Sequence, residues 1–130
     1  MNTISNPVVY FEIPVTNVLR AIQFYRAVFG FEFFTENIDG NEMAHFPFIE
    51  NGTGISGSLA KGETYKPTIN GTLVYFGCND IDLILNKAVE NGGKVLYPKT
   101  SVGSIGFVAE FQDCEGNRIA LYSKPLTDEV

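Results

Sequence analysis

The side chains able to do chemistry in this chain are few and scattered. The 130 residues include one histidine, His45, and two cysteines, Cys78 and Cys114. Two cysteines have neither the number nor the spacing of a disulfide framework or a zinc site. Cys114 also lies between Asp113 and Glu115, whose charges disfavour a thiolate. We therefore expect free, unreactive thiols, and a histidine that is hydrogen-bonded or at the surface rather than catalytic.

Two carboxylates near tyrosines are the best candidates for acid–base chemistry. The alternation of a strand places Tyr10 and Glu12 on one face, Tyr75 on the matching face of a later strand, and Glu110 on that of a third. A carboxylate beside tyrosines in a partly apolar pocket can act as a general base. The alternative is that Glu12 is solvated or pairs with Arg118 or a lysine, and that the tyrosines only fill volume.

These candidates are carried by a strand–helix segment that the chain uses twice. Residues 8–13 form a strand that leads through Thr16 or Asn17, as a cap, into an amphipathic helix at 18–29. About half the chain later, a strand and a helix follow in the same order at 72–78 and 81–91. Glycine follows each helix, as is typical of a helix end. The period indicates two similar halves that share one core.

Further short strands complete each half. They are expected at 31–35, 42–48 and 55–60 in the first half, and at 94–97, 107–112 and 117–122 in the second. Each half is then β-α-β-β-β, with one helix covering one face of its sheet. The pattern predicts an α+β fold of two tandem βαβββ modules, forming curved mixed sheets around a shared cleft. It is a single domain over 1–130, with halves at about 8–60 and 71–123 and a connector between them.

Composition excludes several classes of partner. Nine basic and fifteen acidic residues give a net charge of -6, and the basic residues are spread out. Binding to nucleic acid or to an anionic membrane relies on clustered Lys and Arg, so we expect neither. No apolar run approaches the ~18 residues of a membrane span, and the N-terminus has no signal-peptide pattern. A cytoplasmic location is the expectation.

Several segments carry a resemblance to a known family. In chain order they are Val15-Thr16-Asn17-Val18, Phe29-Gly30-Phe31, Met43-Ala44-His45-Phe46-Pro47, Leu73-Val74-Tyr75-Phe76-Gly77, Gly92-Gly93-Lys94-Val95 and Glu115-Gly116-Asn117-Arg118-Ile119-Ala120-Leu121. Their order and spacing resemble the vicinal oxygen chelate superfamily, which includes glyoxalase I, extradiol dioxygenases and the bleomycin and fosfomycin resistance proteins. The chain is most similar to a bacterial glyoxalase-related subgroup of unassigned activity.

The resemblance implies where a metal would be held. Metal-dependent members use His and Glu side chains, two from each half. The corresponding positions here are Tyr10, one of residues 56–58, Leu73 or Thr72, and Ala120. None of these side chains is a usual ligand for such an ion, and one histidine cannot rebuild a site with two. We therefore expect no metal and no cofactor.

The leading hypothesis is a small-molecule-binding protein of this superfamily that lacks the usual metal ligands. The residues predicted to line its site are Tyr10, Glu12, Tyr75, Glu110 and Ala120. The alternative is a glyoxalase-related lyase, isomerase or dioxygenase acting on a small carbonyl or aromatic substrate, with Glu12 or Glu110 as base. A third possibility is a partner-binding subunit. The resemblance also implies a homodimer.

Overall fold

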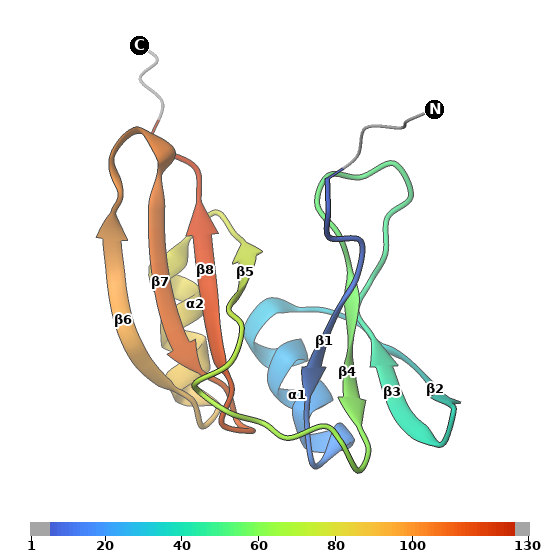
Figure 1. The fold of residues 1–130 in the computed structure, drawn as a ribbon. Coiled ribbons are helices and arrows are strands. Elements are labelled where there is room, and N and C mark those ends of the chain that lie inside the picture. The colour runs from blue at the N-terminus through green and yellow to red at the C-terminus, as the bar shows by residue number, and fades with distance from the viewer. Residues whose placement is uncertain (1–5, 127–130) are drawn as a thin grey trace.

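The computed structural model describes residues 6–126 and contains two four-stranded mixed sheets (Figure 1). The first half runs β1 (Phe11–Pro14), α1 (Val18–Phe29), β2 (Phe34–Ile38), β3 (Asn41–His45), β4 (Gly57–Lys61). The second runs β5 (Val74–Gly77), α2 (Ile81–Glu90), β6 (Lys94–Ser101), the 3-10 turn η1 (Gly103–Ile105), β7 (Phe107–Gln112), β8 (Arg118–Ser123). Strand orders β1-β4-β3-β2 and β5-β8-β7-β6 are equivalent, and the first pair in each is parallel. The α+β fold of tandem βαβββ modules is confirmed.

The ends of several strands differ from the expectation. β1 begins at Phe11, where it first pairs with Gly57, so Val9 is 79% exposed instead of facing the helix. β1 ends at Pro14, which is tolerated as a strand residue because β1 is an edge strand and needs no outward-facing N–H. β2 begins only at Phe34, since the preceding phenylalanines pack into the core.

The helix boundaries follow local chemistry. The side chain of Asn17 caps α1 by accepting from the Arg20 amide at 3.0 Å. Gly30 ends α1 in the left-handed conformation, at φ 84°. Asp80 caps α2 by accepting from the Leu83 amide at 3.1 Å. The cap and stop signals in the sequence therefore placed both helices correctly.

The two halves share one aromatic core beneath the helices. Phe76 of β5 lies 5.0 Å from Phe29, 5.6 Å from Phe46 and 6.0 Å from Phe11, measured between ring centroids. Tyr25 of α1 is fully buried among these rings. Because one phenylalanine of the second half contacts three of the first, the core fixes β1 beside β5.

A polar junction adds to this contact between the halves. The hydroxyl of Tyr25 donates to the buried carboxylate of Asp113 at 2.7 Å. Beside it, Glu115 accepts from the amide of Thr16 at 2.6 Å and from Arg20 at 2.8 Å. The turn between β7 and β8 is thereby held against the start of α1.

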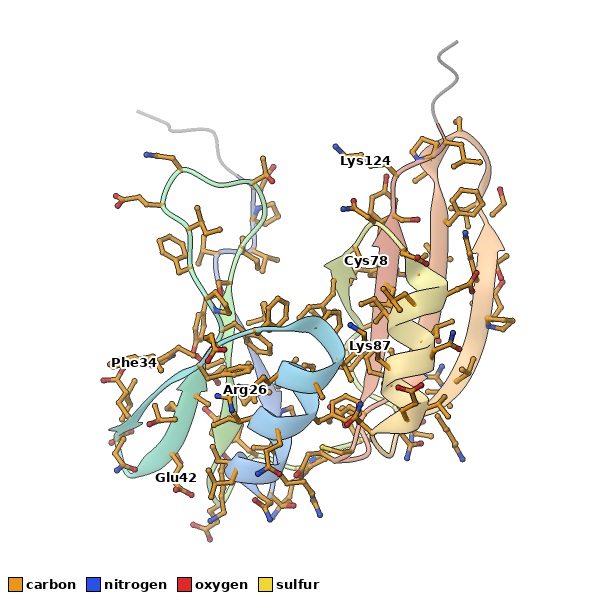
Figure 2. All side chains as sticks on the ribbon, turned by 180° about the vertical axis from the view of Figure 1, so that it is seen from behind. Arg26, Phe34, Glu42, Cys78, Lys87 and Lys124 are labelled. Atoms are coloured by element: carbon orange, nitrogen blue, oxygen red, sulfur yellow. The ribbon has the colours of Figure 1, made fainter. Side chains whose placement is uncertain are left out.

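Both helices lie on the same side of the two sheets, as the front and rear views show (Figure 1, Figure 2). The second face of each sheet therefore carries no helix. We call these two surfaces the open faces. The backbone pairing places corresponding residues of the two halves on the open faces. The residues predicted to line the site are among them.

Candidate functional site

The open face of the first sheet is built around Ser58. In the parallel pair of β1 with β4, Glu12 lies opposite Ser58, and in the antiparallel pair of β3 with β4, His45 does so. Residues directly opposite each other share a face of the sheet. Tyr10, two residues before Glu12, reaches the same face. Three strands thus bring these side chains together around one fully buried hydroxyl.

A continuous series of polar contacts within hydrogen-bonding distance connects six side chains on this face, which we call the Ser58 cluster. Ser58 Oγ lies 2.9 Å from the Tyr10 hydroxyl and 2.5 Å from His45 Nδ1. His45 Nε2 lies 2.7 Å from Glu36 Oε2. At the other end the Tyr10 hydroxyl lies 3.2 Å from Glu12 Oε2, and Tyr65 donates to Glu12 Oε1 at 2.7 Å. The order is Glu36, His45, Ser58, Tyr10, Glu12, Tyr65.

The two tyrosines of the cluster hold their protons firmly. Donation to the Glu12 carboxylate, together with some burial, raises the pKa of Tyr65 to about 12. Burial raises the pKa of Tyr10, and the charge of Glu12 adds to that effect while Ser58 opposes it. Both shifts favour the neutral phenol, because a phenolate would lie close to a carboxylate. At ordinary pH both hydroxyls therefore act as hydrogen-bond donors.

The open face of the second sheet has the same geometry but different chemistry. Tyr75 lies opposite Ala120, and Glu110 lies opposite Ala120 from the other side. Arg118 Nη1 donates to Glu110 Oε1 at 2.5 Å in a half-buried ion pair. Ala120 itself is fully buried, whereas Tyr75 is 53% exposed. An ion pair and an aromatic surface replace the hydrogen-bonded chain of the first sheet.

The structure brings the predicted site residues together in two groups. Tyr10 and Glu12 are in contact on one sheet, and Tyr75, Glu110 and Ala120 are neighbours on the other. Two hollows, of about 660 Å³ and 360 Å³, are lined by none of these five residues. The larger one lies between the start of α1 and strands β2 and β3. A cleft shared by the two open faces stays a prediction.

Four members of the Ser58 cluster were missed or given no role by sequence reasoning. Ser58 was considered only within a metal-ligand segment, His45 was expected to be a hydrogen-bonded bystander, and Glu36 and Tyr65 were not singled out. A signal existed for Glu36. The two-residue turn at Asp39-Gly40 pairs Ile38 with Asn41, and counting back from it places Glu36 diagonal to His45.

For Tyr65 the sequence offered no comparable signal, since it comes from the connector between the halves. The connector is held against the second half, where the amide of Thr68 donates to Asn117 at 3.1 Å and the carbonyl of Ile69 accepts from Arg118. These contacts carry the connector past β1, and Tyr65 meets Glu12 there. Only the folded path of the connector places its hydroxyl in the site.

The positions of the metal ligands in the family do not fit a metal ion here. On the first sheet, Tyr10 and Ser58 hydrogen-bond to each other. On the second, Leu73 and Ala120 carry no donor atom in their side chains, and Thr72, the alternative to Leu73, offers only a hydroxyl. Within residues 6–126, no group of three or more His, Cys, Asp and Glu residues is arranged to hold a metal. Imidazole and carboxylate are the donors such ions prefer, so these four positions do not form a metal site.

The two cysteines have the chemistry expected from the sequence. Both are free thiols. Burial, followed by the charges of Asp113 and Glu115, raises the pKa of Cys114 to about 12. Burial likewise raises the pKa of Cys78. Neither thiol is poised as a nucleophile, because the thiolate is the reactive form.

Comparisons with known proteins agree with this architecture. A model of the Glyoxalase/Bleomycin resistance protein/Dioxygenase superfamily matches residues 8–121. A glyoxylase-like domain-containing protein from Didymella fabae is 30% identical over 118 residues, covering 88% of this chain and 91% of the relative. No helix within the described residues is long and apolar enough to cross a membrane.

Solved structures show the same fold at low identity. A domain from Frankia sp. EAN1pec has a TM-score of 0.71 at 13% identity, covering 92% of this chain and 98% of its own. An antibiotic binding protein from Streptomyces sp. CB03234 has a TM-score of 0.66 at 24% identity, covering 95% and 99%. The fosfomycin resistance protein FosX from Listeria monocytogenes has a TM-score of 0.66 at 14% identity, covering 98% and 97%. The chain belongs to the Glyoxalase/Bleomycin resistance protein/Dioxygenase superfamily, the vicinal oxygen chelate superfamily.

Proposed function

We propose that this protein binds a small molecule on its open faces without using a metal. The observation that carries the proposal is the Ser58 cluster. The resemblance aligns Tyr10, and one of residues 56–58, with metal ligands of the family, and here Tyr10 and Ser58 form one chain of polar contacts with Glu12 and His45. Polar groups held in fixed positions next to aromatic surface are typical of ligand sites.

Exposed aromatic side chains on both open faces support the same proposal. Tyr10 is 46% exposed on the first sheet, and Tyr75 is 53% exposed on the second. A tyrosine presents a flat apolar ring and a polar tip, which suits contact with a planar ligand. The low-identity neighbours share the fold alone, and they include an antibiotic binding protein and a resistance protein. The fold is therefore compatible with binding and does not identify the ligand.

The proposal is tested by metal analysis followed by ligand screening. The purified protein, before and after incubation with zinc, nickel, manganese or iron(II), should hold no stoichiometric metal. A thermal-shift screen of aromatic and carbonyl compounds should then give saturable binding that is lost in Tyr10→Ala and in Tyr75→Ala. The matched control is Leu19→Ala, because Leu19 is 71% exposed on the first helix. Binding that both tyrosine variants retain would refute a site on the open faces, as would one tightly bound ion per chain.

An enzymatic alternative is favoured by one specific contact. Glu12 is flanked by two neutral tyrosine hydroxyls, so a base lies beside two groups that can donate to a carbonyl oxygen once a substrate displaces their present hydrogen bonds. Glu110 is less suited, because Arg118 already engages it. If a ligand is turned over, Glu12→Gln should abolish turnover and leave the fold unchanged. Unchanged turnover in that variant would remove Glu12 from the mechanism.

We also propose that the protein is a cytoplasmic homodimer. Support for pairing comes from large apolar side chains exposed in the first half, on β2 and in the loop between β3 and β4: Phe34 at 66%, Phe48 at 74% and Ile49 at 76%. Two unpaired thiols fit a reducing compartment. Sedimentation equilibrium should give twice the chain mass, and Phe48→Ser should shift it towards the monomer. A monomer at all concentrations would contradict the pairing.

A further inference from the structure

The Ser58 cluster has more contacts than hydrogens available to fill them. Five contacts join its six side chains: Glu36 with His45, His45 with Ser58, Ser58 with Tyr10, Tyr10 with Glu12, and Glu12 with Tyr65. Each contact needs one hydrogen between its two heavy atoms. The three hydroxyls supply one each, and a neutral imidazole supplies one more, whichever ring nitrogen carries it. Two ionised carboxylates supply none.

Four hydrogens for five contacts leave one contact unfilled, and the geometry indicates which one. Neutral His45 donates from Nε2 to the Glu36 carboxylate, since the opposite tautomer would direct a lone pair at that charge. Its Nδ1 then accepts from Ser58, and Ser58 accepts from Tyr10 along the shorter of the two Tyr10 contacts. The Tyr10 oxygen and Glu12 Oε2, 3.2 Å apart, are left as two acceptors facing each other.

We propose that this unfilled contact is a subsite for a hydrogen-bond donor of the ligand, namely a primary ammonium group that Glu12 and Tyr10 accept together. The inference rests on the proposed binding function and names the chemical class that its first-sheet subsite takes. Charge favours an ammonium over a neutral hydroxyl. Within the described residues, no Lys or Arg nitrogen lies within 4.0 Å of a Glu12 or Glu36 oxygen. An ammonium group would therefore meet an unneutralised carboxylate with one free acceptor.

Protonation of His45 would also supply the missing hydrogen, and it would therefore compete with binding of the ammonium group. A proton on His45 supplies the fifth hydrogen: Nδ1 then donates to Ser58, Ser58 to Tyr10, and Tyr10 to Glu12. The groups that face the imidazole are Glu36 and Phe34 from β2 and Ser58 from β4. Beyond Ser58 the contacts continue to Tyr10, which precedes β1, and then to Glu12 of β1. Because both events fill the same contact, each weakens the other by the same factor.

Benzylamine is a suitable probe, with benzyltrimethylammonium as the matched control. Both carry one positive charge on a benzyl group, but only benzylamine has N–H donors. His45 is the only histidine of the chain, so its imidazole resonances give a single readout by nitrogen-15 NMR. Binding to the full chain would be measured by NMR titration at pH 8 and pH 5.5, which lie on either side of the ordinary range of histidine titration.

We expect benzylamine to bind more tightly than benzyltrimethylammonium at pH 8, and about 5- to 10-fold more weakly at pH 5.5 than at pH 8. It should also shift the midpoint of the His45 titration to lower pH, which the control compound should not do to the same extent. Tyr10→Phe should remove the preference for benzylamine. Tyr97→Phe, a change at an exposed tyrosine on the second sheet, should keep it.

Three results would overturn the inference. They are equal binding of the two compounds, no binding of benzylamine up to about 10 mM (about 2.7 kcal/mol on the affinity scale), or an unmoved His45 titration. These results are distinguishable from failure of the proposed function. If neutral aromatic compounds still bind and depend on Tyr10 and Tyr75, the binding proposal survives and only the ammonium subsite is refuted.

Discussion

The two open faces have the same backbone and opposite chemistry. Glu12, Ser58 and His45 lie side by side on the first sheet, and Tyr75, Ala120 and Glu110 occupy the same register on the second. A hydroxyl at the centre of the first face links polar groups on both sides. An alanine at the centre of the second makes no such link. The repeated fold therefore fixes where side chains point, while residue identity gives only the first half a chain of polar contacts that runs across three strands.

The largest expected loss of stability tests whether the two halves unfold together as one cooperative unit. Tyr25→Phe removes a hydroxyl that donates to the buried Asp113 carboxylate across the junction. Hydrogen bonds to charged groups contribute about 1.5–3 kcal/mol, so we expect a loss of about 2 kcal/mol in the free energy of unfolding. Urea denaturation should still give a single transition. Two separate transitions would mean that the halves fold independently.

The ion pair of the second face is the next test. Arg118→Met should lower the free energy of unfolding by about 2 kcal/mol, because it leaves the half-buried Glu110 carboxylate without its cation. Replacing both residues by methionine should recover most of that loss. If the double variant is as unstable as the single one, the ion pair is not the cause.

The hydroxyl of Ser58, at the centre of the first open face, should contribute less to stability than the ion pair does. Its removal should instead change the environment of the neighbouring His45. Ser58→Ala removes the common partner of Tyr10 and His45, and we expect a loss of about 1 kcal/mol by urea denaturation. The His45 resonances should move in this variant and stay in place in Arg118→Met. The exposed Ser104→Ala serves as the control. Identical His45 spectra in wild type and Ser58→Ala would contradict the linked cluster.

The smallest effect concerns the ion pair between Glu115 and Arg20 at the junction of the two halves. Burial disfavours the charged form of Glu115, but the Thr16 amide and Arg20 outweigh it and lower its pKa. Its stabilising contribution is therefore present above the ordinary glutamate range near pH 4.3 and is lost as pH falls through the lowered value. The Glu115 side chain is 0% exposed, but its partner Arg20 is 51% exposed and screened by solvent. Because glutamine also retains the shape and one acceptor of Glu115, Glu115→Gln should cost only about 0.5 kcal/mol at pH 7. That difference should disappear as pH falls through the lowered pKa of Glu115, and a constant difference would contradict an electrostatic origin.

Local sequence signals identified most of the fold. The caps Asn17 and Asp80 and the terminating Gly30 define the helices, because they satisfy backbone groups within a few residues of themselves. Strand ends were less certain: Val9 alternates correctly but has no partner strand, so it is 79% exposed. Pairing is a property of two segments, and one segment alone does not show where it stops.

The candidate site also has a part that the sequence predicted and a part that only the folded structure shows. The sequence by itself determined that Tyr10 and Glu12 point to the same side of the chain, because this depends only on the alternation of extended backbone. Only the tertiary structure decided that Ser58 joins Tyr10 to His45 and that Tyr65 reaches Glu12. Those contacts join residues 13 to 53 positions apart. Strand register and the path of the connector, set by packing of the whole chain, bring them within hydrogen-bonding distance.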